Sequence, residues 1–245
     1  MDLTIKDVAK LFNISEAAIH RLLLHNKIPS YCINGEHRFG LIEIENWMLQ
    51  FDLKQLQETA SCDQQIYPLT DKKKQQVQLD NPISGGMVQF CLYRALHQGD
   101  ILVNIKGDKK EDIISAVTKI VAPKLNVDAE ILAELLIDRE DLSPTALGNG
   151  LAVPHTREAL AKGSFDMVFI VYPETPLEYG ALDSKPVHTL FFLFAGSDKA
   201  HLQLLAKLAH LSSHKEAFQL LLDRSDKTAL LDFVRSWEGQ IRSMG

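Results

Sequence analysis

The residue best suited to chemistry in this sequence is His155. It follows Pro154 at the end of a short apolar run, Leu151–Val153, which predicts a strand. Pro154 fixes the backbone and removes an amide donor immediately before the ring. Arg139 and Arg157 flank the histidine in the sequence, and cations on both sides favour an anionic ligand. The pattern indicates a histidine presented at a rigid strand end to an anion.

The chemistry open to such a ring depends on its protonation. An imidazole with an ordinary pKa near 6.5 is mostly neutral at neutral pH and can act as a nucleophile. Gly148-Asn-Gly150 predicts a tight turn before the strand, but it lacks the Lys-Ser/Thr of a nucleotide phosphate loop. From the residues alone, a single histidine of this kind is more often structural or on the surface, so both readings stay open.

The elements that would hold this histidine follow an α/β pattern. Apolar runs predict strands at 101–105, 151–153, 167–172 and 189–195. Helical periodicity lies between and after them, at 128–138, 198–211, 216–222 and 228–237. A further helix is predicted to begin at the cap Asp108 and to end at Pro123. The alternation predicts a layered α/β domain with a mixed sheet and helices on both faces.

The first fifty residues have a different pattern. Thr4 and Ser15 are predicted to cap two short helices, and Asn34-Gly35 joins two short runs in the manner of a hairpin. A third helix is expected from Ile42 to Leu49. Two short helices joined by a tight turn and followed by a hairpin describe a winged helix-turn-helix module.

Composition sets the division of the chain and its class. The 245 residues are 46% hydrophobic and 24% charged with a net charge of −6, which excludes a disordered chain and a polycation that coats nucleic acid. Residues 51–86 are rich in Gln and Lys and are predicted to form a linker between domains at 1–50 and 87–240. No run is long enough for a membrane helix, and three widely spaced cysteines suit a cytoplasmic protein.

The run Arg139-Glu, Thr145, Gly148-Asn-Gly, Pro154-His155 and Arg157 resembles the phosphorylation-site signature of enzyme IIA of the bacterial sugar phosphotransferase system. The similarity is to the fructose/mannitol class and especially to its nitrogen-regulatory type, and it extends over residues 90–240. Ser143-Pro144 departs from the Gly-Ser usual in that family.

The resemblance implies roles for these residues. His155 would accept a phosphoryl group from the phosphocarrier protein HPr, supported by Arg139 and by a second, unphosphorylated histidine, His201. His201 should lie in the first turn of its helix, where free amides favour an anion; the alternative is a helix-surface residue. Contacts to phosphate or at the rim are expected from a further set of residues: Thr145, Asn149 and Arg157.

The first fifty residues resemble the excisionase-like branch of the MerR-type winged helix-turn-helix family, in their Thr-capped first helix, Ile28-Pro29, Arg38-Phe39 and final Ile-x-x-Trp helix. In that family the second helix enters the major groove and the wing contacts the backbone. The DNA-facing positions would then be His20, Arg21, Lys27, His37 and Arg38. The alternative is a small helical module used for protein contacts.

Three functions follow from these readings: a regulatory phosphocarrier, a transport component that passes phosphate to a separate sugar-permease IIB, and an interaction protein without phosphorylation. The expected phosphate donor is HPr. Further partners would be DNA, a regulatory protein or the permease IIB, and binding to a DNA site would involve a homodimer. No cofactor is predicted. No metal site is predicted either, because His210 and His214, four residues apart on one helix, lack an obvious third ligand.

Overall fold

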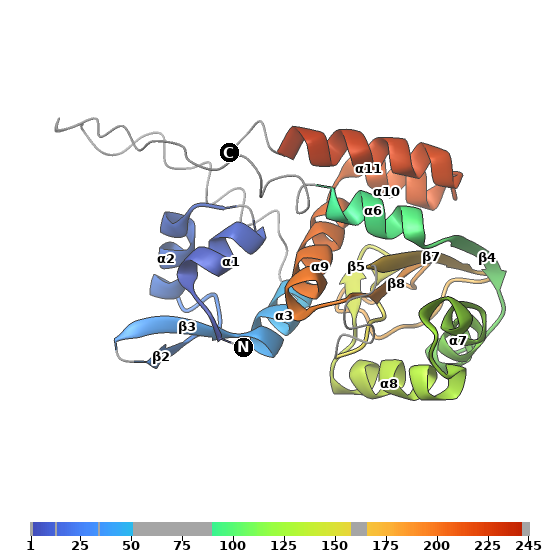
Figure 1. Ribbon diagram of the computed structural model, residues 1–245, viewed down its shortest axis with the longest axis horizontal. Coiled ribbons are helices and arrows are strands. Elements are labelled where there is room, and N and C mark those ends of the chain that lie inside the picture. The colour runs from blue at the N-terminus through green and yellow to red at the C-terminus, as the bar shows by residue number, and fades with distance from the viewer. Residues whose placement is uncertain (1, 13, 34, 51–89, 158–165, 242–245) are drawn as a thin grey trace.

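The computed structural model describes residues 2–12, 14–33, 35–50, 90–157 and 166–241 (Figure 1). The predicted linker at 51–86 lies outside these residues. The described elements form two groups, one before the linker and one after it. The first group is small and comprises three helices and three short strands: β1 (Asp2–Leu3), α1 (Ile5–Phe12), α2 (Glu16–Leu24), β2 (Tyr31–Ile33), β3 (Glu36–Gly40) and α3 (Leu41–Gln50).

The boundaries of the first helices follow from their caps. Thr4 and Asp7 bond reciprocally at the start of α1, with the Thr4 amide donating to the Asp7 carboxylate and the Asp7 amide to the Thr4 hydroxyl. Ser15 accepts from the amide of Ala18 at the start of α2. Gly35 has φ +81°, as a tight hairpin between β2 and β3 requires. The two predicted caps and the hairpin are confirmed, while β1 was not predicted.

The second group is built on a five-stranded mixed sheet with the order β4-β7-β8-β6-β5. Its strands are β4 (Ile101–Ile105), β5 (Ala146–Gly148), β6 (Leu151–Ala152), β7 (Met167–Pro173) and β8 (Thr189–Phe194). β7 pairs antiparallel with β8, whereas β4–β7 and β6–β8 are parallel pairs. The predicted α/β class and mixed sheet are therefore confirmed for this part of the chain.

Helices cover both faces of this sheet (Figure 1). α7 and α8 lie on one face, and α6, α9, α10 and α11 lie toward the other. Their bounds are α6 (Cys91–Gln98), α7 (Lys110–Leu125), α8 (Ala129–Leu142), α9 (Asp198–Ser212), α10 (Lys215–Leu222) and α11 (Lys227–Ile241). Successive residues of β7 alternate between two cores, since Val168 packs into one and Phe169 into the other.

Three predicted helix boundaries are wrong. Asp108 does not cap α7; the helix begins after Lys109, and the Asp112 carboxylate accepts from the amides of Asp108 and Lys109. Pro123 does not end α7 but lies in its last turn, where the loss of one amide donor is tolerated. α8 continues to Leu142 instead of ending at 138, and this extension carries Arg139 in its last turn.

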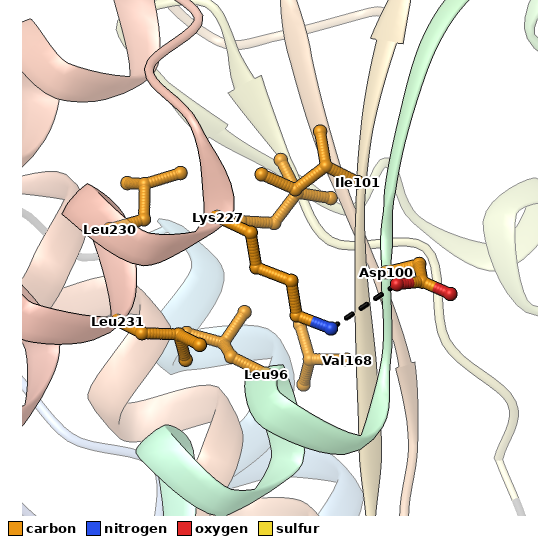
Figure 2. A pocket seen from close by; sticks show the side chains of 8 residues that line it. Leu96, Asp100, Ile101, Val168, Lys227, Leu230 and Leu231 are labelled. Carbon is orange, nitrogen blue, oxygen red and sulfur yellow. Dashed lines mark hydrogen bonds and ion pairs between the residues drawn. The ribbon is translucent and has the colours of Figure 1, made fainter.

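One lysine joins three elements on the α6 side of the sheet (Figure 2). Lys227, at the start of α11, extends its apolar stem past Leu230 and Leu96 toward Asp100. Its Nζ lies 3.2 Å from both the His97 carbonyl oxygen and Asp100 Oδ1. The ammonium group thus satisfies the end of α6 and holds α11 beside β4.

The two groups of elements pack together. α1 and α3 contact α9, and Figure 1 shows α3 lying against α9 between the two groups. One hydrophobic cluster runs from Phe39 and Met48 in the first group to Leu204 and Leu208 of α9 in the second. Within the described residues, no helix is both long and apolar enough to cross a bilayer.

Candidate functional site at the junction of α3, α8 and α9

His155 follows the end of β6 in the chain, and its side chain is fully buried. A parallel bridge to Leu193 of β8 fixes its backbone, and the Leu193 amide donates to the carbonyl of Pro154 at 3.0 Å. Its Nδ1 lies 2.6 Å from the Val153 carbonyl oxygen, which can only accept, so Nδ1 carries a proton. In the neutral ring the lone pair is therefore on Nε2, which faces α8 and α3.

Arg139 supplies the positive charge of the site. Its Nε donates toward His155 Nε2 at 3.1 Å, and its Nη1 donates to the Ser143 carbonyl oxygen at 3.1 Å. The Ser143 contact fixes the end of α8, so the segment that departs from the family pattern helps to orient the guanidinium. Arg139 is 3% exposed, and its planar fork is aimed at the space beside His155 Nε2.

His201 is brought to the same place by α9. Its ring centroid lies 4.9 Å from that of His155, and the residue is 7% exposed. Ser197 caps the helix, accepting from the Ala200 amide with its hydroxyl and from the His201 amide with its carbonyl. The amides of Ala200 and His201 are therefore bonded to Ser197, and His201 lies in the first turn of α9 as expected. The alternative placement of His201 on the helix surface is wrong.

Glu45 of α3 completes the cluster and was missed by the sequence analysis. Its Oε1 accepts from Arg139 Nε at 2.9 Å and from Arg139 Nη2 at 2.7 Å, and lies 2.8 Å from His155 Nε2. Its Oε2 lies 3.4 Å from His201 Nε2, and the residue is 3% exposed. Asn46, next on the helix, accepts from Arg139 Nη2 at 3.1 Å. A carboxylate from the first group of elements thus sits among the cation and both histidines of the second.

The electrostatics of the cluster set the protonation of its members. Burial opposes ionisation of Glu45, but the hydrogen bonds and charges of His155 and His201 outweigh it and hold the pKa of its carboxyl well below the ordinary value. Burial lowers the pKa of His155, although Glu45 acts in the opposite direction. At neutral pH the site holds an anionic carboxylate and a cationic guanidinium. Because Nδ1 bonds to the Val153 carbonyl, the 2.8 Å contact of Nε2 with Glu45 is a hydrogen bond only when the ring carries a proton on both nitrogens.

Two kinds of ligand could be considered for this cluster. The ligand atoms of Glu45, His155 and His201 all lie within 4.8 Å of one another, a grouping that could bind a metal ion. The Arg139 guanidinium lies against both Glu45 and His155 Nε2, however, and would repel a cation at that point. The donor set therefore favours an anion.

Two residues expected to contact phosphate are bonded to other side chains in this structure. Thr145 is fully buried, and its hydroxyl donates to Glu140 Oε2 at 2.6 Å. Asn149 accepts from Lys185 Nζ at 3.0 Å, and its amide donates to Asp183 at 2.7 Å. Thr145 thus joins the segment before β5 to Glu140 of α8. Asn149, at the β5–β6 turn, is bonded to the loop at 183–185.

Arg157 is exposed and lies at the rim of the site. It lines a small crevice of about 40 Å³ between α3 and α8, together with Ile42, Glu45, Asn46, Arg139 and Leu142. The crevice lies where α3 of the first group of elements meets α8 of the second. Its position agrees with the expectation of a rim charge near the histidine.

The histidine pair considered for a metal lies on a different part of α9. His210 packs near Trp237 with ring centroids 6.1 Å apart, and His214 packs near Phe233 at 5.2 Å. Among the described residues, the possible metal-binding groupings do not include either histidine. Their surroundings are those of residues packed between helices.

The positions expected to face DNA lie on α2, in the segment that follows it and on the β2–β3 hairpin. His20, Lys27 and His37 are exposed, while Arg21 and Arg38 are half-buried. Arg38 Nη2 lies 2.6 Å from Glu36 Oε2 on the same strand. None of these five residues belongs to the cluster around His155, which draws on α3 instead.

Comparisons with known proteins agree with the geometry of the second group of elements. A nitrogen regulatory protein of Pseudomonas aeruginosa is 33% identical over 138 residues, which cover 55% of this chain and 82% of that protein. The fructose-specific EIIABC component of the phosphotransferase system of Bacillus subtilis is 29% identical over 138 residues, 55% of this chain and 21% of that protein.

A solved structure has the same fold. The nitrogen regulatory protein IIA-Ntr from Neisseria meningitidis aligns with a TM-score of 0.50 and 23% identity, over 61% of this chain and 99% of that one. The family model of the phosphoenolpyruvate-dependent sugar phosphotransferase system, EIIA 2, matches residues 94–237, which contain Arg139, His155 and His201. Since that match covers more than half of the sequence, the chain belongs to the EIIA 2 family of the phosphotransferase system.

Proposed function

We propose that the protein is a regulatory phosphocarrier and that His155 accepts a phosphoryl group from phosphorylated HPr on Nε2. The observation that carries the proposal is the pair of contacts on the ring. Nδ1 is held by the Val153 carbonyl, which leaves the Nε2 lone pair directed at the Arg139 side chain. A neutral nucleophile facing a fixed cation suits transfer of an anionic group.

The transfer step needs no net proton movement. The Nε2 lone pair forms the new P–N bond, and the bond between phosphorus and the donor atom of HPr breaks with its electron pair left on the donor. The Nδ1 proton stays in its hydrogen bond to Val153. Positioning and charge compensation are the main demands of such a transfer. Arg139 would meet the charge on the phosphoryl oxygens, and the His201 ring lies on the far side of the same space.

The proposal is tested by phosphate uptake. The full chain is incubated with phosphoenolpyruvate, enzyme I and HPr, and its intact mass is measured. One acid-labile phosphate should be added, and His155→Ala should abolish the uptake. His97→Ala, which changes an exposed histidine on α6, is the matched control. Uptake by His155→Ala at the wild-type rate would refute the assignment.

The fate of the phosphoryl group separates regulation from transport. The relative from P. aeruginosa is named a nitrogen regulatory protein, and the one from B. subtilis a fructose-specific EIIABC component. The extra N-terminal elements favour regulation, since a transport component would need only the EIIA fold. If the phosphorylated protein passes its phosphate quickly to a separate IIB domain, the transport function is the better description.

A role in DNA binding for the first fifty residues is a second proposal. Three exposed cationic or titratable side chains support it: His20 on α2, Lys27 in the segment after α2, and His37 on the hairpin. With so few cations, one copy would neutralise only a few phosphates and bind weakly, so a homodimer on two half-sites is required. Selection from random DNA at low salt tests this; enrichment of no sequence would leave protein contacts as the role of these residues.

A further inference from the structure

The histidine site is closed in this structure. His155 is fully buried, and Glu45 and Arg139 are each 3% exposed. A protein donor must bring its phosphorylated atom to within bonding distance of Nε2. Among the described residues, the part of the cluster contributed from outside the EIIA fold is α3, which carries Glu45 and Asn46. Access to the nucleophile therefore requires α3 to move.

Glu45 also occupies the position that a phosphoryl group would take. Its Oε1 lies 2.8 Å from Nε2 and receives two hydrogen bonds from Arg139 at 2.9 and 2.7 Å. Its Oε2 faces His201 Nε2 at 3.4 Å. A carboxylate and a phosphoryl group share a negative charge and oxygen acceptors, so Arg139 can hold only one of them at this position.

We propose that α3 is a built-in ligand of the unphosphorylated histidine site, with the Glu45 carboxylate in the position of the phosphoryl group, and that phosphorylation of His155 releases it. This inference rests on the proposed phosphoryl transfer. Phosphorus bonded to Nε2 would lie closer to the nitrogen than Glu45 Oε1 now does, and its oxygens would occupy the same volume. The added negative charge would also repel the carboxylate across a buried space.

The two events are therefore mutually exclusive and affect each other's equilibrium. Docked α3 slows phosphorylation because only the open fraction of molecules can react; a docked fraction of 90% corresponds to a roughly tenfold slower rate. Phosphorylation in turn favours the form in which the N-terminal elements are separated from α9. The phosphorylation state would then be reported by the exposure of the N-terminal elements.

The rate arm of the test uses Glu45→Gln and Glu45→Ala in the full chain. Both should take up phosphate from HPr about tenfold faster than wild type, because the carboxylate that blocks Nε2 has been removed. Glu43→Gln is the matched control, since Glu43 is an exposed carboxylate on the same helix. Its rate should equal that of wild type. Equal rates for the Glu45 variants and wild type would overturn the proposal.

The structural arm uses amide hydrogen exchange of the peptide spanning α3. Exchange should be faster in the phosphorylated wild-type protein than in the unphosphorylated protein, and Glu45→Ala should show the fast exchange without phosphate. Unchanged exchange on phosphorylation would overturn the proposal even if the rates differ. If neither the wild-type protein nor any variant takes up phosphate, both the proposed function and this inference fail. If all take up phosphate at the same rate, only this inference fails.

Discussion

Glu45 Oε1 lies 2.8 Å from His155 Nε2, although the two residues are 110 positions apart in the sequence. The contact joins α3 to the end of β6 and is stabilised by Arg139, which bonds to both partners. Because the cluster is buried, each charge in it depends on the others for solvation. The histidine site of the EIIA fold and the N-terminal elements are therefore one electrostatic unit.

Replacing Arg139 with Lys should slow phosphate uptake, because lysine keeps the charge but lacks the planar fork that bonds two acceptors. A charged hydrogen bond contributes about 1.5–3 kcal/mol, so at least a tenfold slower rate is expected. The measurement belongs in the Glu45→Ala background, where docking of α3 no longer affects the rate. An unchanged rate in that background would contradict the role of Arg139.

His201→Ala, in the same background, tests the second histidine. The ring lies 4.9 Å from that of His155 and has no covalent role, so its loss should slow transfer without abolishing it. His210→Ala, further along α9, is the control for general effects on the helix. Retention of the wild-type melting temperature together with a slower rate would separate a contribution to transfer from one to folding.

Much of the fold was predictable because its signals are local. The caps at Thr4 and Ser15 and the near-continuous apolar strands β7 and β8 depend on neighbouring residues. The errors lie where tertiary contacts decide. Pro123 stays within α7 because only the last turn loses a hydrogen bond, and α8 extends past 138 because Arg139 is held by contacts from other elements.

The site was predictable only in part, for the same reason. His155, Arg139 and His201 carry a family pattern, and the structure places them together. Glu45 carries no such signal: it lies in a predicted helix with another acidic residue, Glu43, two positions before it. Which of the two is buried depends on how α3 packs against α9, and that contact spans the predicted linker.

The pKa of His155 offers a pH-dependent test of the contact. Burial lowers this pKa, so the ring should stay neutral somewhat below pH 6.5. The Glu45 carboxylate stabilises the protonated ring and raises the pKa relative to burial alone. Glu45→Gln also releases α3 and so exposes the ring, and because burial is the larger influence the pKa of His155 should rise toward its ordinary value. Titration of the ring by NMR measures it; a further fall in the variant would contradict the release of α3.

Lys227→Met tests the junction of α11, α6 and β4. Methionine preserves much of the apolar stem but leaves the His97 carbonyl and Asp100 without their shared donor. The free energy of unfolding should fall by about 1–3 kcal/mol, as for the loss of a charged hydrogen bond. Lys215→Met, at the exposed start of α10, should change it little. Urea denaturation of both variants provides the comparison.

A double-mutant cycle on Glu45 and Arg139 measures how strongly the two parts of the chain are coupled. Each single change to Ala leaves the other charge buried without its partner, which costs about 3–5 kcal/mol for a fully buried pair. The single variants can relieve this cost by undocking α3, so their losses should not exceed the free energy of docking. The double variant contains neither charge and should be less destabilised than the sum of the single variants.

Fluorescence of Trp47, which lies on α3 and donates to the Lys27 carbonyl, reports the unfolding of the N-terminal elements during urea denaturation. Strict additivity would mean that the two side chains contribute independently and that the contact does not couple α3 to the histidine site.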